Sequence, residues 1–574
     1  MLQLVRISRF AAALLLALPV AAQAAAPWQD PVGAAVKAAP ASTADVPEAG
    51  LTPAAETATD QAGQTPTDNF NTRFGIPAQD ASFARSHAIH CDAVRHLKTP
   101  RTYRRLDSYM RPEAFMPASN AAGFFERDFA TGTWGGGREA LEKAGVDIYG
   151  CLGFDYLNVV ESNLSTDPKV ATTAPNPQTQ RNYVQLYGLD FYSRLLNKKW
   201  KGGQLHFSFA WPDSRPISLY QNDLTPIHTA SVHGNFYYDT GSLRDTVEDY
   251  QGFRVFEMWA QQSYGTGVHS GSFIRAGNIY PWINVNRSVL AGMFNFSTFD
   301  EPGTLGTNPN TGRGPIYPTA PLGVQWYHVI NERVDFTTQV GAGYYDPSSG
   351  IDNRRGLRWF LTRENGVEGV AEVTYKGGTY RLDESQLGRP WYVKLGGQFH
   401  TGQLASNVLD VNGGHFQLTG QPSLLYHGNG GLYGTLESMV YREPGSYGQG
   451  LSVFAKTSQY FTDYRNVIKS TYVFGAGYEG LLPGRDRDVL YAGWGNIHMT
   501  KGAALWETHS QSCAQKAARD CRETGIEDIL EFGYTAEVAP WLFAQSSFQY
   551  LIRPYGRADL GHFGDVTFSM GTAF

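Results

Sequence analysis

Charged and aromatic side chains recur at alternate positions of apolar segments along much of this chain. Arg275 lies between Ile274 and Ala276, and Glu257 is followed two residues later by Trp259. Because successive side chains of a strand point to opposite faces, such segments collect their polar groups on one face. Carboxylates beside Arg or Lys can replace the water around a neutral polar solute, and a Trp ring can pack on an apolar ring face. The pattern predicts a polar wall that contacts small solutes.

Ten residues are the candidates for contact with such a solute. They are Arg275, Trp282, Arg287, Glu257, Trp259, Asp147, Asp155, Lys394, Glu437 and Glu531. A wider set expected to face the same way adds Gln185, Asp335, Gln339, Glu372, Gln398, Lys456 and Glu537. Both signs of charge occur, which argues against an anion or phosphate filter, where Lys and Arg would dominate. For Glu257 and Trp259, an ordinary wall position away from any constriction is the alternative.

The segments 212–250 and 281–319 are the longest expected connections, and the second opens with PWINVNRSVLAGMFNF. It contains Trp282, Asn284, Asn286, Arg287 and Asn295 within a short space. One interpretation is a loop that folds inward and narrows a pore. The other is a surface loop whose aromatic residues pack on a neighbour. Both stay open from the sequence.

No catalytic group is expected. The chain has no G-x-S-x-G element, and His206 and His328 stand in strand patterns without an evident nucleophile. We interpret both histidines as wall residues with satisfied hydrogen bonds. No basic patch suggests nucleic acid. The sequence therefore predicts no enzyme activity, no cofactor and no nucleic-acid partner.

Four cysteines, Cys91, Cys151, Cys513 and Cys521, are an even number. In an exported chain this favours disulfides, although four cysteines allow three connectivities. Cys513 could pair with Cys521 within one loop, and Cys91 with Cys151 could tie the N-terminal segment to the first strand. No C-x-x-C spacing occurs, so no metal site is expected.

The start of the chain indicates its compartment. Residues 1–26 have Arg6 and Arg9 before AAALLLALPVAA and a small-residue stretch, which is the layout of a secretory signal peptide. Residues 27–68 are rich in Ala, Pro and Thr and predict a disordered linker. Residues 69–130 are expected to form a periplasmic extension of unknown structure. Residues 131–574 carry the alternating pattern and form the remaining domain.

Alternation from residue 131 onward predicts the elements that position the polar wall. We count about sixteen strands, at 146–160, 182–194, 203–211, 251–264, 270–280, 320–330, 333–345, 367–376, 390–400, 430–441, 450–460, 471–479, 487–497, 528–539, 541–553 and 564–574. Connections after even-numbered strands are short and those after odd-numbered strands are mostly long. This parity is typical of outer-membrane barrels, with periplasmic turns and extracellular loops.

Both ends of this domain fit a barrel. GREALEKAG, residues 137–145, predicts a short helix that ends at Gly145. The final VTFSMGTAF alternates apolar and small residues up to Phe574, which fits a strand that closes a barrel with one face in lipid. The predicted fold class is all-β: a transmembrane antiparallel β-barrel of about sixteen strands, with a short N-terminal periplasmic helix and a disordered N-terminal extension.

Three stretches resemble the carbohydrate-selective porins of the OprB type. They are TGTWGGGREALEKAGVDIYG with the strand FDYLNVV, the turn and strand LLNKKWKGGQLHFSF, and the last hairpin ILEFGYTAEVAPWLFAQSSFQYLIRPYG with the terminal strand. The resemblance spans residues 131–574. It implies a porin of the bacterial outer membrane that passes sugars by diffusion. In the W-G-G-x-R motif we expect Trp134 to pack and Arg138 to anchor the helix by an ion pair.

Other functions remain open. A general porin, or one for polyols or sugar acids, would have the same fold, and a structural envelope barrel is a further alternative. An energy-coupled receptor would need a larger plug and typically about 22 strands. The expected partners are small sugars such as glucose and outer-membrane lipid, and the chain could be a monomer or a homotrimer. Residues 69–130 could bind peptidoglycan or another envelope component.

Overall fold

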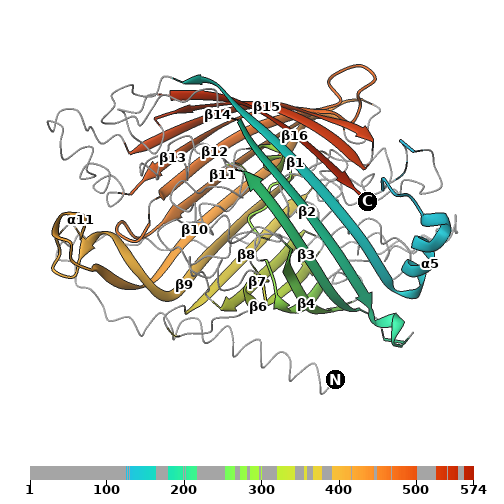
Figure 1. Ribbon diagram of the computed structural model, residues 1–574, viewed down its shortest axis with the longest axis horizontal. Helices are drawn as coiled ribbons and strands as arrows, with labels where there is room; N and C mark the ends of the chain where they lie inside the picture. Colours follow the sequence, from blue (N-terminus) through green and yellow to red (C-terminus); the bar gives the residue numbers. More distant parts are fainter. Residues whose placement is uncertain are drawn as a thin grey trace, which may run out of the picture. The chain divides into compact units, whose positions relative to one another are not determined.

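Sixteen antiparallel strands form one closed barrel in the computed structural model (Figure 1). The structure describes residues 124–125, 127, 129–162, 179–197, 199–200, 202–215, 253–265, 272–280, 285–295, 299, 320–331, 333–342, 355–357, 363, 366–377, 389, 391–414, 416–444, 449–466, 468–500, 525–539, 541–553 and 562–574. The predicted signal peptide, the linker and nearly all of the extension 69–130 lie outside these residues. Within them, every helix is too short or too polar to cross a membrane.

The strands follow one another around the barrel in chain order, and β16 pairs with β1 to close it. They are β1 (Val146–Ser162), β2 (Thr179–Tyr192), β3 (Gly203–Arg215), β4 (Arg254–Tyr264), β5 (Ser272–Asn278), β6 (Leu322–Asn331), β7 (Val334–Ala342), β8 (Val367–Gly377), β9 (Trp391–Asp410), β10 (Ser423–Arg442), β11 (Gly450–Tyr460), β12 (Ile468–Glu479), β13 (Val489–Met499), β14 (Ile526–Ala539), β15 (Leu542–Ile552) and β16 (His562–Ala573). The short helices are η4 (Trp134–Gly136), α5 (Gly137–Ala144), η5 (Ser193–Leu195), η8 (Ala291–Met293) and α11 (Phe416–Thr419). The predicted count of sixteen is confirmed.

The last strand shows why alternation specifies the two faces of the wall. On β16, Phe568 and Met570 are 42% and 41% exposed, whereas Thr567 and Ser569 between them are at most 1% exposed. The apolar set faces outward and the small polar set faces the interior. Because β16 pairs with both β15 and β1, its backbone groups have partners on each side. The apolar stripe at the chain terminus therefore belongs to a closed barrel with no free edge.

One residue of the wider inward-facing set was predicted wrongly. On β2, Leu186 is 1% exposed and lies on the inner face, so the adjacent Gln185 points outward and is half-buried. The hydroxyl of Tyr187, on the same outer face, donates a hydrogen bond to the Gln185 side chain. A tyrosine neighbour thus satisfies a polar group on the outer face, which polarity alone assigned to the interior.

A β-bulge in β4 concentrates side chains on the inner wall. The register with β3 shifts where Ser208 pairs with Glu257 and Phe209 pairs with Val255. As a result Phe256 and Glu257 are both 1% exposed although they are adjacent in sequence. An extra residue in one strand of a pair redirects side chains in this way.

The strands β9 and β10 are longer than predicted. We expected 390–400 and 430–441, but each strand has 20 residues and together they form an extended hairpin. The sequence after His400 is polar and was read as a loop, yet Ser423 still pairs with Asp410 at the tip. The Asp410 carboxylate accepts backbone N–H groups of Asn412 and Gly414, each at 2.8 Å. The pairing of β9 with β10 therefore continues to this capped tip, with two register shifts on the way, at Ser423/Leu425 and His427/Asn429.

The pKa of Asp410 lies below its ordinary value. The hydroxyl of Thr419 on α11 donates to its carboxylate at 2.6 Å and is the largest cause, followed by backbone N–H donors that include Gly414. Hydrogen bonds to a carboxylate favour its charged form. The hydrogen bonds that order the tip of the hairpin therefore depend on ionised Asp410.

The predicted helix at 137–145 is present as α5, and Gly145 ends it with a φ of 103°. The Arg138 guanidinium, 1% exposed, lies 3.9 Å from the Phe129 ring centroid and 4.4 Å from that of Trp134. Arg138 also donates to the Thr131 hydroxyl at 3.3 Å. Cation–π contacts thus organise this start of the domain, and an ion pair for Arg138 stays a prediction.

Candidate functional site

The connection between β5 and β6 is called here the inward loop, and its described residues 279–280, 285–295 and 299 lie inside the barrel. At separate points its backbone N–H groups donate hydrogen bonds to carboxylates on the inner wall. The bonds are Tyr280 N to Glu257 Oε1 at 2.9 Å, Asn286 N to Glu372 Oε2 at 2.6 Å, Leu290 N to Glu437 Oε2 at 3.1 Å and Asn295 N to Glu531 Oε1 at 2.7 Å. The acceptors stand on β4, β8, β10 and β14, so the loop crosses the interior from one wall to another.

These wall carboxylates supply hydrogen-bond acceptors for loop N–H groups that have no strand partner. A loop inside a barrel has N–H groups without strand partners, and a buried N–H without an acceptor is costly. Charged acceptors make hydrogen bonds roughly twice as strong as neutral ones. Glu257, Glu372, Glu437 and Glu531 are all at most 2% exposed, so each bond is shielded from water.

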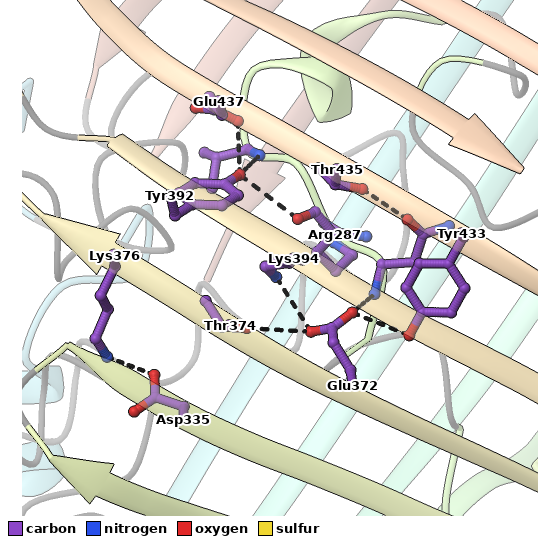
Figure 2. Close-up of polar contacts among 12 residues, drawn as sticks. Arg287, Asp335, Glu372, Thr374, Lys376, Tyr392, Lys394, Tyr433, Thr435 and Glu437 are labelled. Carbon is purple, nitrogen blue, oxygen red and sulfur yellow. Dashed lines mark hydrogen bonds and ion pairs between the residues drawn. The ribbon is translucent and has the colours of Figure 1, made fainter. Parts of the chain in front are cut away.

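Glu372 is the centre of the first polar cluster (Figure 2). Its Oε2 also accepts the Tyr433 hydroxyl at 3.0 Å, while its Oε1 lies 3.8 Å from Lys394 Nζ and 3.4 Å from the Thr374 hydroxyl. Asn286 sits above it with a left-handed φ of 53°. Lys394 supplies a positive charge beside the carboxylate that holds the loop.

Glu437 forms the second anchor, two strands further on, on β10 (Figure 2). Its Oε2 accepts the Ser288 hydroxyl at 2.8 Å and the Tyr392 hydroxyl at 2.7 Å, in addition to the Leu290 N–H. The Ser288 oxygen in turn accepts the Ala291 N–H at 3.1 Å, at the start of η8. One carboxylate oxygen thus fixes the entry of the loop into its short helical turn.

A nearby ion pair stiffens the wall next to these anchors. Lys376 on β8 bonds to the Asp335 carboxylate on β7, and both side chains are at most 6% exposed (Figure 2). Burial of a pair in this way requires close geometry, because each charge loses its water. The interior beside the inward loop therefore holds charges of both signs, as the sequence predicted.

Arg287 differs from its neighbours on the loop. Among residues 285–295 it is the one side chain that is partly exposed, and all the others are buried. The Tyr392 hydroxyl, which donates to Glu437 at 2.7 Å, lies 3.5 Å from the Arg287 carbonyl oxygen (Figure 2). The loop therefore presents one guanidinium where solvent can reach it.

The other face of the inward loop is apolar. Phe294 stacks on Phe299 with ring centroids 4.4 Å apart and meets Tyr491 of β13 at 4.6 Å and Phe454 of β11 at 5.5 Å. The cluster of buried residues continues to Leu551 on β15. On this side, the barrel interior is a packed hydrophobic core and not a polar surface.

A separate polar stack lines β2 to β5, and we call it the Trp259 stack. His206 Nδ1 lies 2.8 Å from Asp190 Oδ1, and the His206 ring stacks on Trp259 with centroids 4.5 Å apart. On the other face of the indole, the Arg275 guanidinium lies 3.8 Å from a Trp259 ring centroid. Arg275 also donates to Gln261 Oε1 through Nε at 3.0 Å and Nη2 at 2.8 Å. Both faces of Trp259 are therefore occupied by protein groups.

The Trp259 stack depends on residues that the sequence did not single out as a group. Asp190 carries no distinguishing motif, and its pairing with His206 requires β2 and β3 to align in register. The expectation that His206 is a wall residue with a satisfied hydrogen bond is confirmed. Glu372, expected only to face inward, proves to be an anchor of the loop. Inward-facing carboxylates on β4, β8, β10 and β14 were the available signal.

The ten candidates are distributed over three places. Arg275, Glu257 and Trp259 lie on the β4–β5 wall, and Lys394, Glu437 and Glu531 lie on the wall that holds the loop. Arg287 lies on the loop itself. Trp282 is outside the described residues, as are the side chains of Asp147 and Asp155 on β1. The described part of the structure does not identify which of these ten residues contacts a solute.

Cys151, on the inner face of β1, is disulfide-bonded. Cys91, Cys513 and Cys521 lie outside the described residues, so the predicted pairings remain predictions. Within the part of the chain that the structure describes, no group of three or more His, Cys, Asp or Glu side chains is arranged to hold a metal ion.

Comparison with known proteins identifies the family. Residues 199–567, more than half of the chain, match the family described as carbohydrate-selective porin, OprB family. The W-G-G-x-R stretch lies before this match. A comparison of the sequence with curated proteins gives no match.

One solved structure supports the fold. The high-pH structure of Pseudomonas putida OprB superposes with a TM-score of 0.64 at 17% identity, covering 79% of this chain and 100% of that chain. The low-pH structure of the same protein gives a TM-score of 0.43 at 12% identity, with coverages of 78% and 98%. The sixteen-stranded barrel and the family match together place this chain in the OprB family of carbohydrate-selective porins, transport proteins of the outer membrane that are not enzymes.

Proposed function

We propose that this porin passes small sugars, monosaccharides such as glucose above all, by diffusion through a water-filled path beside the inward loop. The observation that carries this proposal is the crossing of the interior by a loop that is anchored on four glutamates and presents Arg287 to solvent. An anchored loop sets a fixed width, and an accessible guanidinium supplies polar contacts at that width.

The chemistry of this constriction suits hydroxyl-rich solutes. Arg287 offers planar N–H donors for sugar oxygens, whereas Lys394 and Glu372 are buried and contribute charge behind the loop. A sugar hydroxyl both donates and accepts, so such groups can replace its hydration water. Because a solute that binds tightly would block the path, these contacts must be weak and exchangeable.

In this proposal Trp259 is a positioning residue and not a platform for the sugar ring. It is 3% exposed and lies between His206 and Arg275. A cation above an indole is held by the negative face of the ring. Trp259 therefore orients Arg275, and Arg275 contributes charge to the wall of the path. Contact of Trp282, Asp147 and Asp155 with the solute stays a prediction.

Several finer expectations belong to the same proposal. By the rule that short turns are periplasmic, α5 and the Asn331–Val334 turn face the periplasm. The chain assembles as a monomer or a homotrimer, which mass measurement in detergent would distinguish. Binding of peptidoglycan or another envelope component by residues 69–130 is testable by removing that segment.

Liposome swelling tests the proposal directly. The purified protein would be compared for entry of glucose, a disaccharide, a sugar acid and an uncharged amino acid of similar size to glucose. We expect glucose to enter faster than the size-matched amino acid, and Arg287→Gln to reduce this difference. Arg333→Gln, at an exposed turn position, is the matched control. Equal rates for all small solutes would indicate a general pore, and no swelling would indicate a structural barrel.

A further inference from the structure

We infer that three glycines on the inner wall, Gly475 and Gly477 of β12 and Gly493 of β13, determine the size limit of the channel. We call them the glycine recess. They lie under the described segment of the inward loop between Leu290 and Phe299. This inference shares one assumption with the proposed function, namely that the inward loop borders an open path through the barrel.

The glycine recess is continuous across two strands. Gly475 and Gly493 are directly paired in the register of β12 and β13, and Gly477 is two residues further along the same face of β12. A Cβ on Gly493 would lie 2.6 Å from both the Phe294 and the Phe299 ring. A Cβ on Gly475 would meet the Phe454 ring of β11 first and would lie 3.0 Å from Phe294 Cζ. At Gly493 the loop rings therefore occupy the space that a side chain would fill, whereas at Gly475 the wall residue Phe454 fills it together with Phe294.

The second loop contact is made by Leu290. A Cβ on Gly477 would come closer than 3.0 Å to Leu290 Cδ1, a separation that real Cβ contacts essentially never show. Leu290 and Phe294 are at most 1% exposed. The two side chains fix the loop against the wall at both ends of η8.

The backbone does not explain these glycines. None of the three is among the described residues with positive φ, so other residues could adopt the same conformation. Glycine inside a strand weakens the strand and often marks a close approach of another group. Here the group that approaches is the inward loop, so space is the reason for glycine at these positions.

Because of the two anchors, the width of the path depends on the size of the side chains in the glycine recess. Leu290 N is held by Glu437 and Asn295 N by Glu531, on either side of the residues that fill the glycine recess. A larger side chain in the recess pushes this segment away from the β12–β13 wall and toward the axis of the barrel. Because the segment is held at both ends, it moves inward and narrows the path.

Single-channel conductance in KCl tests the inference without reference to sugar preference. We expect Gly493→Ala to lower the conductance and Gly493→Val to lower it further, with loss of disaccharide entry before loss of glucose entry. Gly434→Val on β10 is the control, since a Cβ there meets Leu395 Cδ2 at an ordinary 3.5 Å. Gel electrophoresis without heating would identify variants that do not fold, because unfolded barrels migrate more slowly than folded ones. Such variants would be excluded from the comparison.

A compensating substitution separates pore width from general damage. Gly477→Val should also lower the conductance, and the double variant Gly477→Val with Leu290→Ala should recover it toward the wild-type value, because Leu290 is the side chain that a Cβ at Gly477 meets first. Unchanged conductance in both Gly493 variants, or a failure of Leu290→Ala to restore the conductance of Gly477→Val, would overturn the inference. If the wild type conducts KCl but shows no preference for sugars, the proposed function fails while the conductance series still decides the role of the glycine recess.

Discussion

Two halves of the barrel interior hold the same loop by different chemistry. On β4, β8 and β10, carboxylates accept backbone N–H groups, whereas on β11 to β15 the loop packs through Leu290 and Phe294 into an apolar core and keeps one such bond, from Asn295 N to Glu531 on β14. Hydrogen bonds are directional and fix where the backbone passes. Packing is not directional but supplies more free energy for each buried side chain. The comparison indicates that the polar half sets the position of the loop and the apolar half holds it there.

The largest effect is expected on the apolar half. Phe294→Ala removes a fully buried ring, and such changes cost about 3–5 kcal/mol. The loop should loosen and become sensitive to protease while the barrel stays folded. Limited proteolysis and channel noise would measure this. Phe532→Ala on the outer face, where the ring is 54% exposed, is the control. Equal protease sensitivity of the two variants would contradict the importance of packing.

An effect of comparable size is expected on the polar half, where three donors lose their acceptor. Glu437→Leu leaves the Ser288 hydroxyl, the Leu290 N–H and the Tyr392 hydroxyl without their acceptor. Each buried donor without a partner costs roughly 1–3 kcal/mol. Glu437→Gln keeps an acceptor oxygen and should be milder. Hydrogen exchange of the Leu290 amide would rank wild type, Gln and Leu in that order, and a Gln variant as fast as the Leu variant would contradict the assignment.

The Trp259 stack should affect selectivity more than stability. Trp259→Leu removes the surface between His206 and Arg275, and a desolvated cation–π contact is worth about 2 kcal/mol. We expect a reduced difference between glucose and a size-matched amino acid in liposome swelling, with little change in thermal stability. Trp211→Leu, at an outward position that is 46% exposed, is the matched control. An unaltered preference for glucose would remove Arg275 from the solute path.

The smallest effect is expected at the tip of the β9–β10 hairpin. The pKa of Asp410 is lowered in the folded state, so its contribution is present above the ordinary pKa near 3.8 and is lost as pH falls through the lower folded value. Exchange of the Asn412 and Gly414 amides should therefore accelerate, relative to the intrinsic rate, only in strongly acidic solution. Asp410→Asn should abolish this pH dependence. A persistent pH response in that variant would point to another group.

Alternation and connection length were sufficient to predict the barrel. The apolar and polar sides of β16 separate as the sequence indicated, with Phe568 outward and Thr567 inward. The prediction was wrong where a face or a strand end was assigned from the polarity of the residues alone. Gln185 faces outward because a tyrosine satisfies it, and the polar residues after His400 continue a strand because pairing with β10 extends that far.

The candidate site was predictable in part. The inward loop was one of two interpretations of residues 281–319, and the wall carboxylates were expected on the inner face. Their partners were not predictable, because Glu437 and Leu290 are far apart in sequence and meet only when the barrel closes. The pairing of His206 with Asp190 likewise depends on strand register.

The sequence by itself determined which side of each strand meets lipid, how many strands there are and which family the chain resembles, because period-two patterning is enforced by the solvent on each face. The tertiary structure alone decided what the interior polar groups do. Glu257, Glu372, Glu437 and Glu531 hold a loop, and Trp259 lies between two protein groups. These roles depend on distances between strands that are distant in sequence, and no local pattern encodes such distances.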